Sequence, residues 1–540
     1  MNRTDRIFLL VFLVLSILSA GCARKGRDVG IEGEKADLFI LHTNDTHSYM
    51  AGRDASGFPC TDDAQCFGGY ARIAYAIQKA RDDGKNVLAV DAGDRFQGTL
   101  FYRQHGWPAI ADCSALISYD AATLGNHEWD GGCAELAKYI GALRDTKTVI
   151  AANMTPRGSC PLVSSVPPPY IIREIGGHKV GVIGLANDEV VTVSNACRDT
   201  QFADRALSVR RAVRELEAKG VHRIVLVTHI GLPADRELAR AVDGVDVIVG
   251  GHTHSYLGPG SKEGPYPIVE HSPSGQPVLV VTASKATQYI GELACNFDER
   301  GVLTAWSGQA RELLPSAPRD PKVSARVAEY ARSVRALLDQ EIGRHTIDMG
   351  PDGLDACREG QCVSGMFMAD AMLEFGRKYG AKIGLINGGA VRAALRPGTI
   401  TAGDILTCFP FEDKIVLRDY TGAQLSEALE HGLAEERACG PRILQPSGLR
   451  YEIDSEKPVG QRLRSVVYVD AQGKTSPLRP KKVYRVALTS YLAEGGDSFA
   501  MLKKGRVVPC KELTDAEVIT NYFKKHKPAT LKETRRILRK

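Results

Sequence analysis

The sequence lacks several features that would assign it to a common class. Lys and Arg total 69 against 64 Asp and Glu, and no long basic run is interleaved with aromatic residues. A nucleic-acid-binding groove is therefore not indicated, and we expect no nucleic-acid partner. Internal repeats, low-complexity segments and a second membrane-spanning run are also absent from the sequence. What remains is a globular chain of 540 residues, too long for one ordinary core, so we expect at least two domains.

Paired CxxC motifs are missing as well, which argues against a zinc site built from cysteines. If Cys22 is set aside, the 13 cysteines leave an even number, as expected for disulfides in an oxidising compartment. Proximity along the chain predicts two local disulfides, Cys60–Cys66 and Cys357–Cys362. Weaker predictions are Cys113–Cys133, Cys160–Cys197 and Cys408–Cys439, with Cys295–Cys510 as the remainder.

The N-terminus has the pattern of an export signal. Arg3 and Arg6 precede an apolar run over residues 7–15, and small residues then lead to Cys22. This predicts a signal peptide over residues 1–21. The last residues resemble a bacterial lipobox, although Ser19 stands where Leu is usual. We therefore expect a lipid anchor on Cys22, a polar tether over residues 22–36, and a periplasmic or cell-surface protein whose only membrane contact is that anchor. Plain secretion is the alternative.

Short apolar runs alternate with helical patterns in the first half. Strands are expected over residues 38–41, 87–90, 149–152, 179–183, 223–227 and 245–249, and helices over 70–81 and 205–219. A proline-rich shift near residue 315 precedes a helical pattern over 323–342, and the second half again mixes strands with helices. The pattern predicts an α/β fold with a first domain over 37–315, a linker helix within 316–342, a second α/β domain over 343–525 and a basic tail over 526–540.

Groups that bind metals follow five of these apolar stretches. They are Asp45 with His47, then Asp94, then Asn126 with His127, then His229, and finally His252 with His254. Any one of these histidines, taken alone, is more often a hydrogen-bonded core or surface residue than a metal ligand. Asp45 and His47 are separated by one residue, so at a strand end both side chains can face the same way. Five such clusters together predict a dinuclear metal site, in which the two carboxylate oxygens of Asp94 can bridge the cations.

The motifs over residues 43–47, 93–94, 125–128, 228–229 and 251–254 resemble those of the calcineurin-like metallophosphoesterases, and within them the 5′-nucleotidase family. The resemblance extends over residues 37–523. It implies a four-layer αββα sandwich followed by a smaller α/β nucleotide-binding domain, joined by a helix. It also implies two divalent metal ions, Zn, Mn, Co or Mg, one held by Asp45, His47, Asp94 and His254, the other by Asp94, Asn126, His229 and His252. His254 is a departure, because relatives usually carry Gln or Asn there.

His127 and Asp130 resemble the catalytic dyad of that family. A histidine just after a metal-bound Asn can approach phosphoryl oxygens, and an acid three residues later can orient it and favour its charged form. The alternative for Asp130 is a helix N-cap for a helix starting near Gly131, and the two roles are compatible.

Residues of the second half resemble the family's substrate site. Asn387 and Arg392 match its phosphate- and nucleoside-binding turn, and Arg358 matches a second guanidinium, with a solvated surface arginine as the alternative. Phe411 and Tyr491 match the aromatics that sandwich the base, with core packing as the alternative, and Asp497 matches the acid that binds the ribose hydroxyls.

The resemblance and the ligand chemistry together predict a hydrolase that removes phosphate from extracytoplasmic nucleoside 5′-monophosphates by attack of a metal-bound hydroxide. Because the metals and the nucleoside pocket lie in different domains, rotation about residues 323–342 would bring them together. Alternatives are a UDP-sugar or dinucleotide pyrophosphatase, a 2′,3′-cyclic phosphodiesterase, a related sulfur-chemistry hydrolase, and a non-catalytic nucleotide-binding lipoprotein. The sequence does not fix the oligomeric state.

Overall fold

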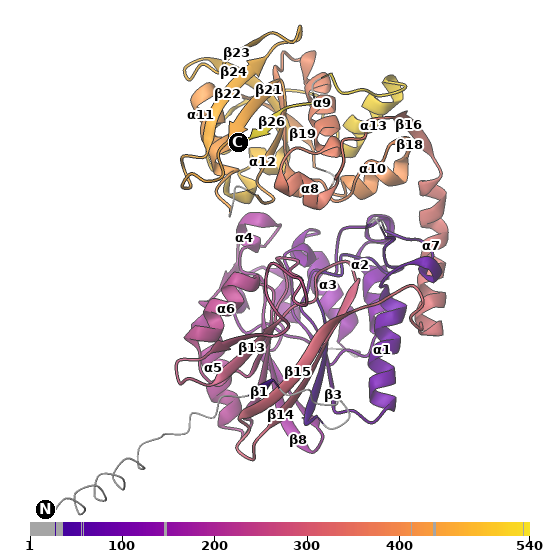
Figure 1. Ribbon diagram of the computed structural model, residues 1–540, viewed down its shortest axis with the longest axis vertical. Helices are drawn as coiled ribbons and strands as arrows, with labels where there is room; N and C mark the ends of the chain where they lie inside the picture. The colour runs from indigo at the N-terminus through magenta and orange to yellow at the C-terminus, as the bar shows by residue number, and fades with distance from the viewer. Residues whose placement is uncertain are drawn as a thin grey trace, which may run out of the picture.

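The computed structural model describes residues 27–28 and 36–540, apart from 56, 58, 145–147, 412, 436–438 and 533. Two α/β bodies lie one above the other and are joined along one side by α7 (Pro321–Leu338) (Figure 1). The expected signal peptide, Cys22 and most of the expected tether lie outside the described residues. Among those described, no helix is both long and apolar enough to cross a membrane.

Two sheets form the first domain. The first has the order β1-β15-β14-β2-β3-β4-β5, and the second β12-β13-β11-β10-β8-β7. Their bounds are β1 Arg27–Asp28, β2 Leu38–Thr43, β3 Val87–Asp91, β4 Ala121–Ala122, β5 Thr148–Val149, β7 Tyr170–Ile175, β8 His178–Leu185, β10 Arg223–Thr228, β11 Val247–Val249, β12 Ile268–His271, β13 Pro277–Val281, β14 Tyr289–Phe297 and β15 Leu303–Glu312. Strands β2 to β5 are parallel, as are β8, β10, β11 and β13, so their carboxyl ends meet at one edge of each sheet.

Apolar side chains of the two sheets pack against each other, as Leu88 and Val90 do with Val225 and Val227 in one buried cluster. Helices cover the outer faces: α1 (Tyr70–Asp82), α2 (Leu100–Ala115), α3 (Cys133–Leu143) and α7 on the first sheet, α5 (Arg205–Glu217) and α6 (Leu232–Ala241) on the second. A strand that is covered on both faces consists almost entirely of apolar residues, which is why these strands could be predicted from apolar runs in the sequence. The predicted αββα sandwich is confirmed.

The second domain has one main core beneath a five-stranded sheet of order β20-β17-β24-β19-β25. A four-stranded sheet, β23-β22-β21-β26, lies beside it. The bounds are β17 Ile383–Asn387, β19 Ile415–Thr421, β20 Leu444–Ser447, β21 Leu449–Ile453, β22 Leu463–Val469, β23 Thr475–Pro477, β24 Val483–Thr489, β25 Arg506–Val508 and β26 Ile537–Arg539, with helices α8 Leu354–Glu359, α9 Val363–Arg377, α10 Ala402–Cys408, α11 Gly422–His431, α12 Ser490–Ala493 and α13 Asp515–Lys525. Part of the basic C-terminal segment thus pairs with β21 as β26.

The α7 helix begins at a strong start signal. The Asp320 side chain accepts hydrogen bonds from the backbone N–H groups of Lys322 and Val323, and Pro321 occupies the first turn. Its buried face packs beside α1 and α2. The helix ends at Leu338, earlier than the predicted 342, because Glu341–His345 forms β16 and pairs with β18 (Gly398–Thr401).

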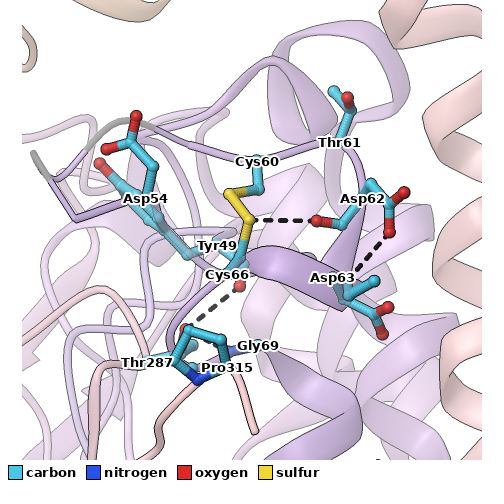
Figure 2. The surroundings of a disulfide bond; sticks show 12 residues. Tyr49, Asp54, Cys60, Thr61, Asp62, Asp63, Cys66, Gly69, Thr287 and Pro315 are labelled. Atoms are coloured by element: carbon cyan, nitrogen blue, oxygen red, sulfur yellow. Dashed lines mark hydrogen bonds between the residues drawn. A yellow bond between two sulfur atoms is a disulfide. The ribbon is translucent and has the colours of Figure 1, made fainter.

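Two predicted disulfides, Cys60–Cys66 and Cys357–Cys362, are confirmed, and Figure 2 shows the first, with the Cys66 sulfur near the Asp62 carbonyl. Cys113–Cys133 is wrong: Cys197 lies within bonding reach of both Cys133 and Cys160, whereas Cys113 is a buried thiol. The predicted Cys160–Cys197 pair therefore competes with Cys133–Cys197.

The pairs Cys408–Cys439 and Cys295–Cys510 are also wrong, because Cys295 and Cys408 are buried thiols. The prediction assumed that an even number of cysteines would all form disulfides. Cysteine also packs often in protein cores as a small apolar residue.

Thiol labelling tests these assignments. Alkylation of the unfolded, unreduced protein, followed by peptide mass mapping, should modify Cys113, Cys295 and Cys408. It should also modify either Cys133 or Cys160, whichever is not bonded to Cys197. Cysteines 60, 66, 357 and 362 should become labelled only after reduction. Recovery of a linked peptide containing Cys295 and Cys510 would contradict the assignment.

Candidate active site

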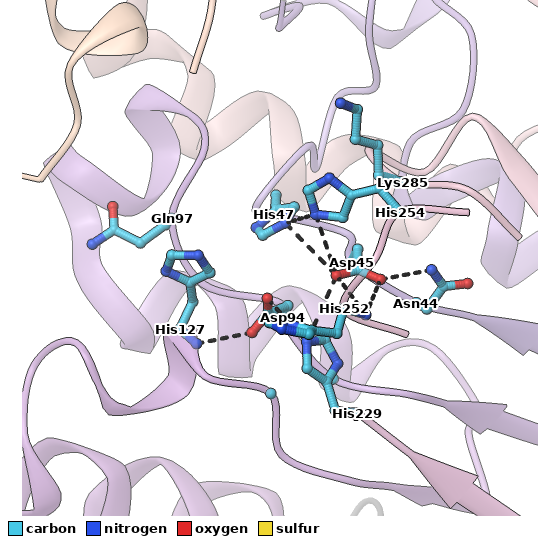
Figure 3. A network of polar contacts seen from close by, with 12 residues as sticks. Asn44, Asp45, His47, Asp94, Gln97, His127, His229, His252, His254 and Lys285 are labelled. Carbon is cyan, nitrogen blue, oxygen red and sulfur yellow. Dashed lines mark hydrogen bonds and ion pairs between the residues drawn. The ribbon is translucent and has the colours of Figure 1, made fainter. Parts of the chain in front are cut away.

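The seven predicted metal ligands all lie in loops that follow β2, β3, β4, β10 and β11. Because β2, β3 and β4 are parallel neighbours in one sheet, and β10 and β11 in the other, these loops meet at one end of the sandwich. Figure 3 shows Asp45, His47, Asp94, His229, His252 and His254 gathered there, with His127 beside them. Segments more than two hundred residues apart in the chain therefore supply one polar cluster.

Asp45, His47 and His254 form one candidate metal group, in which one ligand atom of each lies within 4.8 Å of the others. The two histidine Nε2 atoms are 3.0 Å apart, and Asp45 Oδ1 is 3.9 Å from His47 and 3.4 Å from His254. His47 donates from Nδ1 to the carbonyl of Phe96 at 3.2 Å, which leaves Nε2 as the lone-pair nitrogen facing the group.

Asp94, His229 and His252 form a second such group. His229 donates from Nδ1 to the carbonyl of Ala92 at 2.6 Å, and its Nε2 lies 3.1 Å from Asp94 Oδ2. The side-chain oxygen of Asn126 is buried and has no hydrogen-bond partner among the described residues. A buried amide oxygen without a partner is unfavourable, and a cation would satisfy it. The residues present therefore fit divalent metal ions.

The backbone at these ligands is strained. Asp45, His47, Asp94, His252 and His254 have φ angles of 49°, 45°, 56°, 82° and 58°. Positive φ is uncommon for residues with a side chain and costs of order 1–3 kcal/mol each. Asp45 and His47 therefore converge through left-handed turns after β2 has ended at Thr43, and the predicted strand alternation is the wrong reason for their common direction.

The electrostatics of the cluster favour a charged Asp94 and mostly neutral imidazoles, whereas burial raises the pKa of Asp45 to about 7. Although burial opposes it, His229 and His127 hold the pKa of Asp94 well below its usual value. Burial lowers the pKa of His252 to about 3, with His229 adding to the shift. At His229, burial acts in the same direction, but Asp94 and Asp45 outweigh it and raise the pKa to about 10. Asp94 and Asp45 thus attract positive charge to the space between the two groups of ligands, and a cation there is stabilised.

Glu128 received no role from the sequence, yet it fixes two of the ligand loops. It is fully buried, and its carboxylate accepts hydrogen bonds from the backbone N–H groups of Gly125 at 2.7 Å, Asp94 at 3.0 Å and Arg95 at 2.6 Å. These bonds hold the loop of Asp94 against the loop of Asn126. An acid placed between the Asn126–His127 pair and a tryptophan was the available sequence signal, because a buried carboxylate needs several donors.

His127 and Asp130 make the predicted pair, with 2.7 Å between Nδ1 and Oδ2. Against the effect of burial, Asp130 and Asp94 raise the pKa of His127. The other oxygen of Asp130 accepts a hydrogen bond from Ser194 Oγ at 2.7 Å. The capping alternative is wrong, because α3 begins at Cys133 after Gly132, without a side-chain cap.

The second domain places aromatic and basic side chains over this cluster. The Phe411 ring stacks on His127 with ring centroids 5.8 Å apart, and the Arg392 guanidinium lies 5.7 Å from the centre of the Phe411 ring. Burial lowers the pKa of Arg392, and the nearby carboxylate of Asp94 opposes that shift. Arg392 therefore lies near enough to be affected by the charge of Asp94, and it lines one cavity with the ligand His47.

The remaining predicted substrate residues also lie in this domain. Asp497 accepts hydrogen bonds from Asn387 Nδ2 and from the Tyr491 hydroxyl, both at 2.8 Å. Arg358, on α8, is not a solvated surface residue: its Nε is buried and has no hydrogen-bond partner among the described residues. Burial and the charge of Arg392 lower its pKa to about 10. Two half-buried guanidinium groups that repel each other are suited to an anion with several oxygens.

Comparisons with known proteins agree with this geometry. Residues 39–256 match the calcineurin-like phosphoesterase family, and residues 342–504 match the 5′-nucleotidase C-terminal domain. The chain is 31% identical to the 5′-nucleotidase of Bos taurus, over 91% of this chain and 89% of that protein. It is likewise 31% identical to the snake venom 5′-nucleotidase of Naja atra, over 91% of this chain and 96% of that protein.

A solved structure, the 5′-nucleotidase precursor from Thermus thermophilus, superposes with a TM-score of 0.84 at 35% identity, over 93% of this chain and 99% of that one. All three comparisons indicate the same family: the family models, the sequence identities across both domains and the shared fold. The predicted resemblance is confirmed, and the chain is a metal-dependent phosphoesterase hydrolase that belongs to the 5′-nucleotidase family.

Proposed function

We propose that this protein hydrolyses nucleoside 5′-monophosphates outside the cytoplasm, releasing phosphate. The observation that carries the proposal is the position of two second-domain residues: Phe411 stacks on His127 of the first domain, and Arg392 lies over Phe411 and lines one cavity with His47. A phosphate group bound to the ligand cluster would then meet a guanidinium and an aromatic ring on its other side. The 5′-nucleotidases to which the chain is similar support the same reaction.

Two divalent cations, Zn, Mn, Co or Mg, would occupy the cluster. Asp45, His47, Asp94 and His254 would hold one, and Asp94, Asn126, His229 and His252 the other. When bound, the cations lower the pKa of a water molecule and neutralise phosphate charge. Nitrogen and oxygen ligands in this mixture suit several metals, so the ligand set alone does not select one.

His127 would stabilise the charge that develops on the phosphoryl oxygens. Its Nδ1 is hydrogen-bonded to Asp130, so Nε2 is the nitrogen that can donate to substrate. The nearby carboxylates favour the protonated ring, which both donates and carries positive charge. Asp130 acts through His127 and is a positioning residue.

The second domain would select the nucleotide. Phe411 and Tyr491 would stack on the base, Arg358 and Arg392 would bind phosphate, and Asn387 and Asp497 would hold the nucleoside. Asp497 already accepts bonds from Asn387 and Tyr491, and each carboxylate oxygen retains a lone pair for a ribose hydroxyl.

Export and lipid anchoring on Cys22 belong to the same proposal. They rest on the N-terminal pattern of Arg3, Arg6, the apolar run and Cys22. Disulfides at Cys60–Cys66 and Cys357–Cys362 are consistent with an oxidising compartment.

The central test is phosphate release from AMP, UMP and UDP-glucose by protein loaded with Mn²⁺, Zn²⁺, Co²⁺ or Mg²⁺. We expect release from the monophosphates, loss of activity on treatment with a chelator, and a fall in kcat/KM of at least about 100-fold in Asp94→Ala and His127→Ala. Asp298→Ala is the control, because Asp298 lies in the turn after β14, at the far end of the sheet. Activity that survives both the chelator and the Asp94 change would contradict the proposal.

Replacing Asp130 should separate catalysis from binding. Asp130→Asn removes the charge that favours protonated His127, so kcat should fall by roughly 10-fold while KM for AMP stays nearly constant. Asp130→Glu, which keeps the charge, should recover part of the rate. Equal kcat values for wild type and Asp130→Asn would show that the pair does not serve the reaction.

Changing Glu128 to Gln should weaken metal binding. The amide would turn an N–H donor toward backbone donors that now bond a carboxylate, at a cost of about 2 kcal/mol or more. We expect a lower melting temperature and a higher metal concentration for half-maximal activity. Glu135→Gln, at an exposed position on α3, is the matched control and should change neither quantity.

A further inference from the structure

Lys285 lies at the domain boundary, next to the active site, and has no role in the proposed function so far. In Figure 3 it stands beside His254 with its amine turned away from the ligand cluster. The Nζ atom is 3.0 Å from Asp355 Oδ1, on the α8 helix of the second domain that also carries Arg358. Lys285 is thus a first-domain cation directed at the phosphate-binding helix of the second.

Lys285 shares a cavity with groups of both domains. The cavity, of about 100 Å³, is lined by His47, Arg53, Lys285, Asp355 and Arg392, among others. It therefore connects a candidate metal ligand, a proposed phosphate-binding arginine and this lysine. Of the cavity's two carboxylates, Asp352 is engaged by the Ser364 backbone N–H and hydroxyl at 3.0 and 2.6 Å.

The positive charges around Lys285 outnumber the available carboxylates. Burial and the charges of Arg358 and Arg392 lower the pKa of Lys285 to about 8, while Asp355 acts in the opposite direction. The Asp355 side chain is 80% exposed against 17% for Lys285, so water competes for the carboxylate. One exposed carboxylate cannot fully compensate an enclosed ammonium beside two guanidinium groups. An anion with several oxygens would satisfy all three cations at once.

We propose that Lys285 is a third phosphate-binding cation, supplied by the first domain, which joins Arg358 and Arg392 on the phosphoryl group of the substrate. The inference rests on the proposed nucleotidase function and adds a residue to its phosphate site. Asp355 is the partner of the ammonium in the absence of phosphate, and the flexible stem of lysine allows the ammonium to turn from the carboxylate to the phosphate. Phosphate binding then ties the two domains together through Lys285.

The test compares ligands with and without phosphate on the full-length, Mn²⁺-loaded protein. For Lys285→Met we expect roughly a 10- to 100-fold rise in KM for AMP and in the inhibition constant of inorganic phosphate. The inhibition constant of adenosine, which lacks phosphate, should stay within about 2-fold. Lys285→Arg, which keeps a cation, should recover most of the phosphate affinity.

Two further variants separate phosphate binding from a mere contact between domains. Asp355→Asn breaks the same ion pair but keeps the ammonium, so phosphate inhibition should change by less than about 3-fold. Arg396→Gln breaks another interdomain pair, with Asp54 at 2.9 Å, and should leave phosphate inhibition unchanged. The proposal is overturned if Lys285→Met shifts adenosine and phosphate equally, or shifts neither.

Failure of the parent proposal would be visible separately. If the wild-type protein releases no phosphate from AMP, the nucleotidase function fails. Calorimetric binding of inorganic phosphate to the same metal-loaded variants would still decide the role of Lys285. A fall in phosphate affinity in Lys285→Met, with the melting temperature preserved, supports the inference, and an unchanged affinity contradicts it.

Discussion

The arrangement depends on one buried carboxylate, that of Asp94, which lies between the two candidate metal groups. One of its oxygens accepts the His127 backbone N–H at 2.8 Å, and the other faces His229 at 3.1 Å. A charged group so enclosed is tolerable only if positive charge and donors surround it. The His127 backbone N–H, the surrounding imidazoles and the charge of Arg392 answer that requirement, while Glu128 holds the Asp94 loop in place through its backbone N–H. Removing Asp94 would leave these groups without a common centre.

The sandwich provides the stability that this site uses. Parallel strands buried on both faces supply two rigid edges, and the ligand loops after β2, β3 and β11 contain strained left-handed residues. Backbone strain of about 1–3 kcal/mol per residue persists only where the packing and hydrogen bonds of the surrounding structure hold the conformation in place. Short, strained loops anchored on rigid strands also place their side chains more accurately than long ones would. The polar cluster is thus held by apolar packing some distance below it.

Much of this could be predicted from the sequence, and the failures have physical causes. Asp45, Asp94 and His229 follow continuous apolar runs, so their position at strand ends could be inferred. Cys60–Cys66 and Cys357–Cys362 were predictable because their partners are close in the chain. The convergence of Cys133, Cys160 and Cys197 depends on how distant segments fold together, as do the contacts of Glu128 and Lys285. Local patterns carry no information about such contacts, and the end of α7 was misplaced for the same reason.

Division of the site between two domains explains how a general phosphoester centre becomes selective. In the proposed function, the ligand cluster of the first domain would bind the phosphoryl group, whereas Phe411, Tyr491 and Asp497 would bind the nucleoside. The stacking of Phe411 on His127 and the ion pair of Lys285 with Asp355 cross the boundary, and Arg392 lines one cavity with His47. A ligand must bridge that boundary to gain every interaction of the site, and a phosphate without a nucleoside would lack those of Phe411, Tyr491 and Asp497. Selectivity in this fold therefore depends on the relative placement of the domains as much as on any single pocket.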